Sequence, residues 1–391
     1  MIQIIEQPIT INELYSINYK TMRKVKRLTR CYVSLLLLLA ASNLKAADTT
    51  AIRAQLAAHR NELYYPNSVE RFYKAAGFRL AWIAPDTVKT HAWDAMLLLD
   101  CVIQYGLNHS DYHPSQLLYP KLHELIENSG KSNNRQTALY DIMLTDAVIA
   151  FANNLHYGRL NLEWPPAKID KKTGTGFRAE VILANALAQK DFYSAIISAQ
   201  PTSASYKSLQ YKMHLVTGLY TGDCYETPES EIRLMAVNLE RMRWVDGNVN
   251  NFIAINVPSK ILSYYINDTV YRFKIKSGVF GNLPSSFNEF VADNGTMVLG
   301  QKKNPLTIPA EGKQLIANNF ITVQNAGKLA SLLYGRQVGN RGARHFQLTK
   351  PLAVYVTYYT CEMQDGVLIS YKDIDHRDEK LERALYRAEK L

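Results

Sequence analysis

The spacing of the hydrophobic residues changes once along this chain, near residue 250, and that change constrains the fold most. Before it, apolar residues recur about every four positions, as in "EIRLMAVNLERMRW" at 231–244. After it, "FIAINVPSKILSYYINDTVYRFKIK" at 252–276 alternates in three runs. A period near 3.6 indicates helices, and a period of two indicates strands. The sequence therefore predicts an α+β protein, with an all-helical domain followed by a mostly-β domain.

The helical domain is expected over residues 50–217. Within it, "TALYDIMLTDAVIAFANNL" at 137–155 places an apolar set on one helical face, and Asn67 is a candidate cap for an earlier helix. Residues 165–175, rich in Pro, Lys and Gly, predict a loop. The residues of that apolar face are Leu139, Ile142, Met143 and Ala150.

Turn residues at 218–230 predict a linker, and residues 231–391 then form the expected β domain. This domain begins with the amphipathic helix at 231–244 and continues as a β-meander. Residues 351–363 predict one further strand, Asp365–Gly366 a tight hairpin turn, and the charged C-terminal segment a closing helix.

The first 46 residues have the features of a secretory signal peptide. A basic stretch is followed by a short apolar run from Cys31 to Ala41 and by small residues up to Ala46. The run is shorter than the roughly 20 residues that span a membrane. Met22 fits the start of such a peptide better than Met1. We therefore expect export and no stable membrane anchor after cleavage.

Charge and cysteine content narrow the class of protein further. The net charge of +10 falls to +5 without residues 1–46, because seven Lys/Arg and two Asp/Glu leave with them. This mild excess does not favour nucleic acid as a partner and suits an anionic one. Three cysteines remain, Cys101, Cys224 and Cys361, so at least one is unpaired, and no spacing indicates a metal knuckle. We expect neither a cofactor nor a metal.

Several stretches resemble the L,D-transpeptidases, in the large periplasmic branch that carries a helical scaffold domain before the catalytic domain. The stretches are "FYKAAGFRLAWI", "YGLNHSDYH", "LTDAVIAFANNLHYGRLN", "IRLMAVNLERMRW", the three alternating runs from 252 to 276, and "PLAVYVTYYTCEMQDGVLISYKDIDHRDEKL". They follow the family's order. The resemblance implies a periplasmic protein of the Gram-negative envelope, acting in peptidoglycan biogenesis.

The catalytic motif of that family, Ser-His-Gly-Cys-x-Arg, is degenerate here. Aligned through "ITVQNAGKLASLL" at 321–333, its fixed positions fall on residues that cannot perform the reaction, which needs a thiolate, a histidine that activates it and donors for the oxyanion. Phe320 stands at the nucleophile, and Thr322 lacks the fork of arginine. Asn325 is a candidate cap for the helix that follows. The degenerate positions are Ala317, Asn318, Asn319, Phe320 and Thr322.

Other reactive groups have structural explanations that we favour. Cys361 is the most plausible displaced nucleophile, but an inert thiol is the better interpretation. The residues of "NHSDYHP", His109, Asp111 and His113, need not converge on a metal, because Pro114 disfavours a continuing helix. The remaining charged candidate of this domain, Asp146, should pair with a basic residue or cap a backbone group.

Basic residues are the candidate ligand contacts. "GNRGARHF" at 339–346 concentrates Arg341, Arg344 and His345, which could contact the carboxylates of stem peptides, although a solvated loop is favoured. Arg159 is expected to tie the helical domain to the β domain through a carboxylate.

The sequence thus favours an exported, catalytically inactive relative of the transpeptidases that binds peptidoglycan stem peptides or a wall-synthesis protein. Two alternatives remain open. One is an active L,D-transpeptidase that forms 3-3 cross-links with a displaced cysteine, and the other is a structural envelope protein without affinity for the wall.

Overall fold

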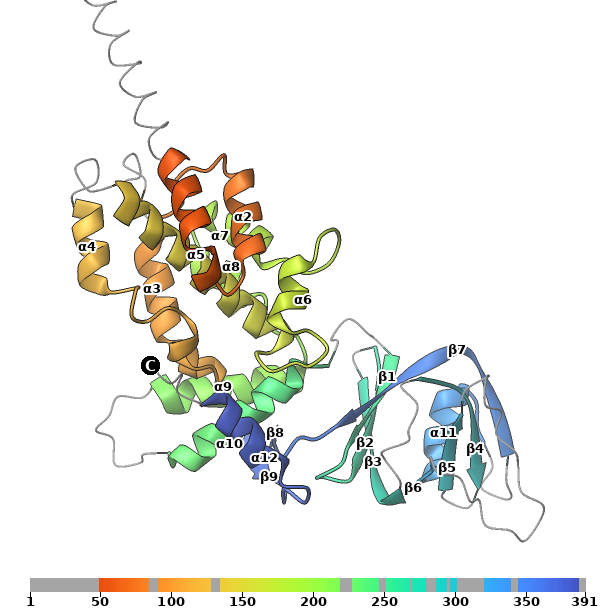
Figure 1. Cartoon of the computed structure of the whole chain (residues 1–391). Coiled ribbons are helices and arrows are strands. Elements are labelled where there is room, and N and C mark those ends of the chain that lie inside the picture. The colour runs from red at the N-terminus through yellow and green to blue at the C-terminus, as the bar shows by residue number, and fades with distance from the viewer. Residues whose placement is uncertain are drawn as a thin grey trace, which may run out of the picture.

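The protein is an α+β molecule in which a helical region precedes a β-barrel (Figure 1). The computed structural model describes residues 49–83, 91–127, 134–218, 227–245, 251–267, 269–278, 286–293, 296–300, 320–338 and 344–386. The predicted signal peptide at 1–46 and the motif positions Ala317, Asn318 and Asn319 lie outside these ranges, as do Cys224 and Arg341.

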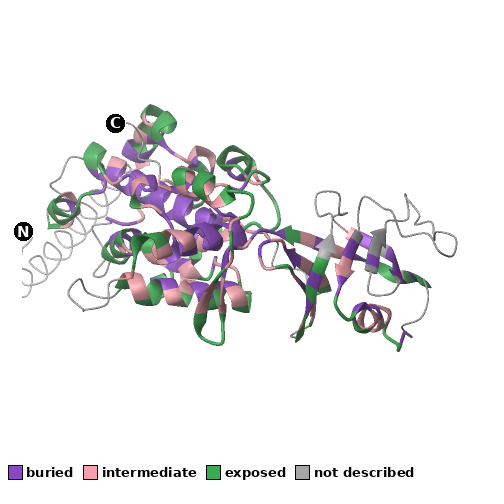
Figure 2. Cartoon of the chain, turned by 90° about the horizontal axis from the view of Figure 1, so that it is seen from below, coloured by how far each residue is buried: buried purple, intermediate pink, exposed green. Residues whose placement is uncertain are grey.

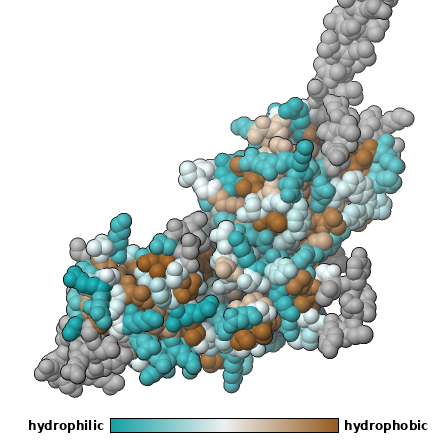
Figure 3. Space-filling model, turned by 180° about the vertical axis from the view of Figure 1, so that it is seen from behind, coloured by the Kyte–Doolittle hydropathy of each residue, from teal (hydrophilic) through white to brown (hydrophobic). Residues whose placement is uncertain are grey.

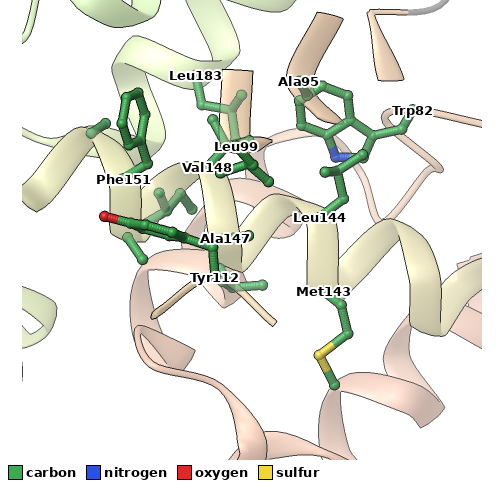
Figure 4. Close-up of a cluster of buried hydrophobic side chains, with 14 of the residues drawn as sticks. Trp82, Ala95, Leu99, Tyr112, Met143, Leu144, Ala147, Val148, Phe151 and Leu183 are labelled. Atoms are coloured by element: carbon green, nitrogen blue, oxygen red, sulfur yellow. The ribbon is translucent and has the colours of Figure 1, made fainter. Parts of the chain in front are cut away.

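The helical region is built around one long helix, α5 (Asn134–Tyr157), which is buried on almost every side. Its packing is wider than the single apolar face predicted, because small and apolar residues surround the helix and other helices cover it. Figure 4 shows its side chains among those of neighbouring segments. Besides α5 and the helical residues 49–58, the helices of this region are α2 (Pro66–Ala75), α3 (Ala92–Asp100), α4 (Tyr119–Glu127), α6 (Pro166–Lys171), α7 (Ala179–Leu187), α8 (Phe192–Ile197) and α9 (Ala204–Gly218), with short 3-10 turns η1 (Arg60–Glu62), η2 (Val102–Tyr105) and η3 (His109–Asp111).

Two predictions for this region are wrong. The segment 165–175 contains the helix α6, and Asn67 is not the cap of α2, which begins at Pro66. The carboxylate of Asp170, on α6, accepts hydrogen bonds from the backbone N–H groups of Asn67 at 3.0 Å and Ser68 at 2.7 Å. A side chain from a hundred residues away therefore satisfies the first turn of α2, which local sequence cannot reveal.

The strands from 251 to 357 close into a barrel in the order β1-β2-β3-β6-β5-β4-β7. The predicted meander forms its first three antiparallel strands, and β7 closes the barrel by pairing in parallel with β1, Phe252 opposite Ala353. The strands are β1 (Asn251–Asn256), β2 (Ile261–Ile266), β3 (Thr269–Gly278), β4 (Ser286–Asp293), β5 (Thr296–Gly300), β6 (Phe320–Val323) and β7 (Arg344–Thr357).

The helix α11 (Ala326–Tyr334) packs into the core of the barrel. Its residues Leu329 and Ala330 are fully buried in one cluster with Ile253, Phe290 and Ile321 of the strands. Figure 2 shows buried residues along the interior of the helical region and on the strands. Residues of β1, β2 and β3 alternate between this core and the outer face, as the period of two predicts.

A third cluster joins the end of the helical region to the C-terminus. The helix α10 (Glu229–Met242) and the hairpin of β8 (Cys361–Gln364) and β9 (Val367–Ser370) share this cluster with α9, through Leu209, Leu239 and Cys361. The closing helix α12 (Arg377–Leu385) lies against α10 (Figure 1). Residues 231–245 and 361–386, which we expected in the β domain, therefore pack with helices rather than with the barrel.

The segment 351–363 is divided between two strands instead of forming the single strand predicted. The strand β7 ends at Thr357 because the next backbone N–H groups leave the sheet: Tyr359 donates to Asn256 Oδ1 at 2.7 Å, and Thr360 donates to Asn238 Oδ1 at 2.8 Å. The hairpin turn at Asp365–Gly366 is confirmed, with both residues at positive φ, 48° and 82°.

Candidate functional site

The strand β6, which contains two of the aligned motif positions, forms part of the barrel wall and ends in a turn before α11. Thr322 is half-buried on β6, between Ser277 of β3 and Thr296 of β5. Its neighbours Ile321 and Val323 are buried in the barrel core, so Thr322 faces the outer side of the sheet. The strand begins at Phe320, whose side chain is outside what the structure describes.

The turn after β6 presents polar groups to solvent. Asn325 occupies the N-cap position of α11 in a left-handed conformation, at φ 63°, which asparagine tolerates better than most residues. Its side chain makes no capping hydrogen bond, so the predicted capping role is wrong. Its backbone carbonyl instead accepts hydrogen bonds from the N–H groups of Lys328 and Leu329.

A cationic pocket of about 460 Å³ opens beside this turn on the outer face of the barrel. Arg272 and Lys274 of β3 and Lys328 of α11 line it, together with the amides Gln324 and Asn325, and none of the described lining residues is acidic. The residue between the two strand cations, Phe273, and the next one, Ile275, are buried, so alternation directs Arg272 and Lys274 outward.

The three cations of this pocket are exposed, and within the described ranges none of them forms an ion pair. Arg272 acts on a neighbouring phenol: burial raises the pKa of Tyr265, and the positive charge of Arg272 opposes that rise. Three positive charges from two elements, with no carboxylate among the described lining residues, favour an anion at this place. Arginine and lysine at these positions would bind a carboxylate by charge-assisted hydrogen bonds.

This pocket was not predicted, although the sequence contains a signal for it. In "YRFKIK" a cation occupies every second position of a predicted strand, which places all of them on one outward face. The contribution of Lys328 was not visible, because only the pairing of β3 with β6 brings the start of α11 beside β3.

Cys361, the candidate displaced nucleophile, is fully buried under α10. Its Sγ lies 3.8 Å from the carbonyl oxygen of Leu234, and burial, helped by the charge of Asp378, raises the pKa of its thiol to about 12. A nucleophilic cysteine needs the opposite conditions, an exposed and electropositive site. Burial also raises the pKa of the half-exposed Cys101.

The acidic and histidine residues of "NHSDYHP" do not converge. His113 Nε2 lies 2.7 Å from Asp146 Oδ2, whereas Asp111 pairs with Arg159 at 2.6 Å. His109 is 3.4 Å from Asp100 at the surface. Across the described ranges, no group of three or more His, Cys, Asp or Glu residues could hold a metal ion.

Asp146 has both roles that the sequence predicted. It pairs with His113, and its two oxygens accept the backbone N–H groups of Tyr64 at 2.8 Å and Tyr65 at 2.9 Å.

The predicted basic contacts near the start of β7 do not act together. Arg344 and His345 are consecutive strand residues and therefore point to opposite faces. His345 Nε2 lies 3.1 Å from Oε2 of Glu289, a buried carboxylate that disfavours a second anion at this histidine. Arg344 is exposed, on a different strand from the cationic pocket.

Arg159 ties the helical region to α12, although by other groups than predicted. Its carboxylate partner, Asp111, belongs to the helical region, and its Nη1 donates to the carbonyl of Ala384 on α12 at 2.7 Å. The backbone N–H groups of Arg159 and Leu160 donate to the buried carboxylate of Glu240. Sequence reasoning missed Glu240, because its partners are backbone groups eighty residues earlier.

Comparison with known protein families supports a scaffold domain in the helical region. Residues 67–213, from α2 to α9, match the family model described as a Scaffold domain. None of the curated proteins matches the chain. Within the described ranges, no helix has the length and apolar character needed to cross a membrane.

Proposed function

We propose that this protein is an exported relative of the L,D-transpeptidases that has lost catalysis and binds the carboxylates of peptidoglycan stem peptides in the periplasm. Support for the family comes from the Scaffold domain match at 67–213 and from the succession of scaffold, leading helix, strands and a strand–turn–helix at 320–334. Support for the loss of catalysis comes from the residues at the motif positions, with phenylalanine where the family has its nucleophile.

The cationic pocket beside the β6–α11 turn is the single observation that carries the binding role. It lies on the face of the barrel to which Thr322 points, and its charge matches the free carboxylates of stem peptides. An inactive protein with such a pocket would bind wall peptides. It would bring either the bound peptide or its own surface to a wall-synthesis protein. Residues 1–46 would direct the chain to this compartment.

Co-sedimentation with purified sacculi tests this function. We expect the protein to pellet with sacculi at low salt, and the double variant Lys274→Glu with Lys328→Glu to bind about 30-fold more weakly. Two reversed charges at roughly 1 kcal/mol each account for that factor. Binding should also weaken at 1 M salt, where exposed charges are screened.

Lys350→Glu is the matched control, because Lys350 is exposed on β7 of the same barrel and outside the pocket. This substitution changes the charge at its site by as much as each pocket substitution does, and it should leave co-sedimentation with sacculi unchanged. No retention of the wild-type chain would refute wall binding and leave the structural envelope protein as the remaining role. Equal losses of sacculus binding in the control and in the pocket variant would show that the cationic pocket is not the binding site.

A further inference from the structure

A second, larger groove lies where the helical region, α12 and β7 meet. Its volume is about 880 Å³, within the range of ligand-binding clefts. The loop after α5 forms one wall through Leu160 and Leu162, the turn after α10 contributes Trp244, and α12 contributes Leu381. The floor is the end of β7 and the two residues after it, and every residue from Ala353 to Tyr359 lines the groove. Among the described lining residues, the cationic pocket and this groove share none.

The end of β7 has one edge in this groove that is without a strand partner among the described residues. Pairing with β4 ends where Ser286 meets Ala353, and beyond that point no strand among the described residues covers this edge. The carbonyl of Thr357 accepts the N–H of Val257, toward β1. Because alternate residues direct their backbone groups to opposite edges, the N–H and C=O groups of Val354 and Val356 point to the open one.

Exposed apolar side chains from three elements surround this edge. Leu162 is 95% exposed, Val356 44% and Trp244 38%. The indole of Trp244 is held in place, because its Nε1 donates to Glu240 Oε1 at 3.0 Å. In the view from behind, apolar residues are exposed on both the helical part and the barrel (Figure 3). Apolar side chains that gather around one groove are typical of an interaction site.

The charges at the rim favour an acidic occupant. Lys380 forms no ion pair within the described ranges, and Arg377, although paired with Asp375 at 2.9 Å, keeps 60% of its side chain exposed. Arg241 also lines the groove but is buried in an ion pair, and Glu163 is the one acidic residue among the described lining residues. Complementary charge at such a rim selects partners and orients them.

We propose that this groove binds an extended peptide segment of a partner protein, which adds as a strand to β7 at Val354–Val356. Strand addition satisfies the open backbone groups, and alternate apolar side chains of the peptide contact Leu162 and Trp244. An acidic side chain of the peptide pairs with Lys380. This interaction is independent of the wall-binding pocket, so the same chain holds a wall peptide on one face and a protein on another.

Selection of phage-displayed nine-residue random peptides on the purified chain tests the proposal. We expect enriched peptides to alternate apolar residues and to carry an acidic one. A synthetic copy should lose at least tenfold in affinity, by fluorescence anisotropy, when alternate backbone nitrogens are methylated, because strand hydrogen bonds need those N–H groups. Leu162→Asp should cause a similar loss, and Lys380→Glu a loss of severalfold.

Leu97→Asp is the matched control, since Leu97 is 61% exposed on α3 and does not line the groove. It should bind the peptide like the wild type. Three results would overturn the proposal: no enriched family of peptides, binding that survives both N-methylation and Leu162→Asp, or a wild-type dimer in sedimentation analysis that Leu162→Asp dissociates. The last would assign the groove to a second copy of the chain.

Discussion

At the scale of the residue, a single buried carboxylate organises the segment at 81–83, after α2. Asp141, fully buried on α5, accepts hydrogen bonds from the backbone N–H groups of Ala81, Trp82 and Ile83 and from the hydroxyl of Tyr73. An irregular segment can be buried only if such groups find partners. The sequence shows a charged residue within a helix but not the backbone groups that it serves.

Asp141→Asn should destabilise the protein by roughly 2–4 kcal/mol at pH 7, because the amide of asparagine would turn a donor toward N–H donors that need an acceptor. Urea unfolding measures this. Asp94→Asn, at an exposed carboxylate on α3, is the control and should change little. Equal effects would show that Asp141 does not organise the segment.

The same residue predicts a pH dependence. Burial outweighs the hydrogen bonds and raises the pKa of Asp141 to about 6 in the folded protein. Between about pH 4 and pH 6 the folded state therefore holds a proton that the unfolded state has released, so stability falls as pH rises through this window. The wild type should lose about 3 kcal/mol relative to Asp141→Asn across it. A constant difference between the two proteins from pH 4 to pH 7 would contradict the assignment.

At the scale of the element, helix ends show what sequence can and cannot predict. The existence and type of α5, α10 and β1–β3 follow from periodicity alone. The start of α2 does not, because its cap is Asp170, whose carboxylate reaches it from α6. The end of β7 also escapes prediction, because Asn238 and Asn256 draw its backbone out of the sheet.

Asp170→Ala should lower stability by roughly 2–3 kcal/mol, through the lost cap and the buried donors left unpaired. Thermal unfolding followed by circular dichroism measures the change, as a drop in Tm of about 5–10 °C. Asp191→Ala removes an exposed cap from the six-residue α8, and its effect should be clearly smaller. If the two variants melt together, the remote cap of α2 does not stabilise the fold.

At the scale of the whole molecule, the order of regions is predictable from the sequence, but the partners of amphipathic elements are not. The apolar side of α10 was visible in the spacing of Met235 and Leu239. That α9 and the β8–β9 hairpin would cover it was not, since periodicity says that a face is buried but not against what. The same holds for the candidate site: the residues that differ from the aligned motif were visible in the sequence, whereas the cationic pocket depends on the pairing of β3 with β6.

Central to the proposed function is that the chain keeps the fold of an enzyme without its nucleophile. Intact-protein mass after exposure of the purified chain to a carbapenem, the β-lactam class that the thiols of the L,D-transpeptidases accept, tests it most directly. With phenylalanine at position 320 and a buried Cys361 whose pKa is raised, we expect the unmodified mass. A stoichiometric adduct that maps to one cysteine would contradict the account and identify a relocated nucleophile.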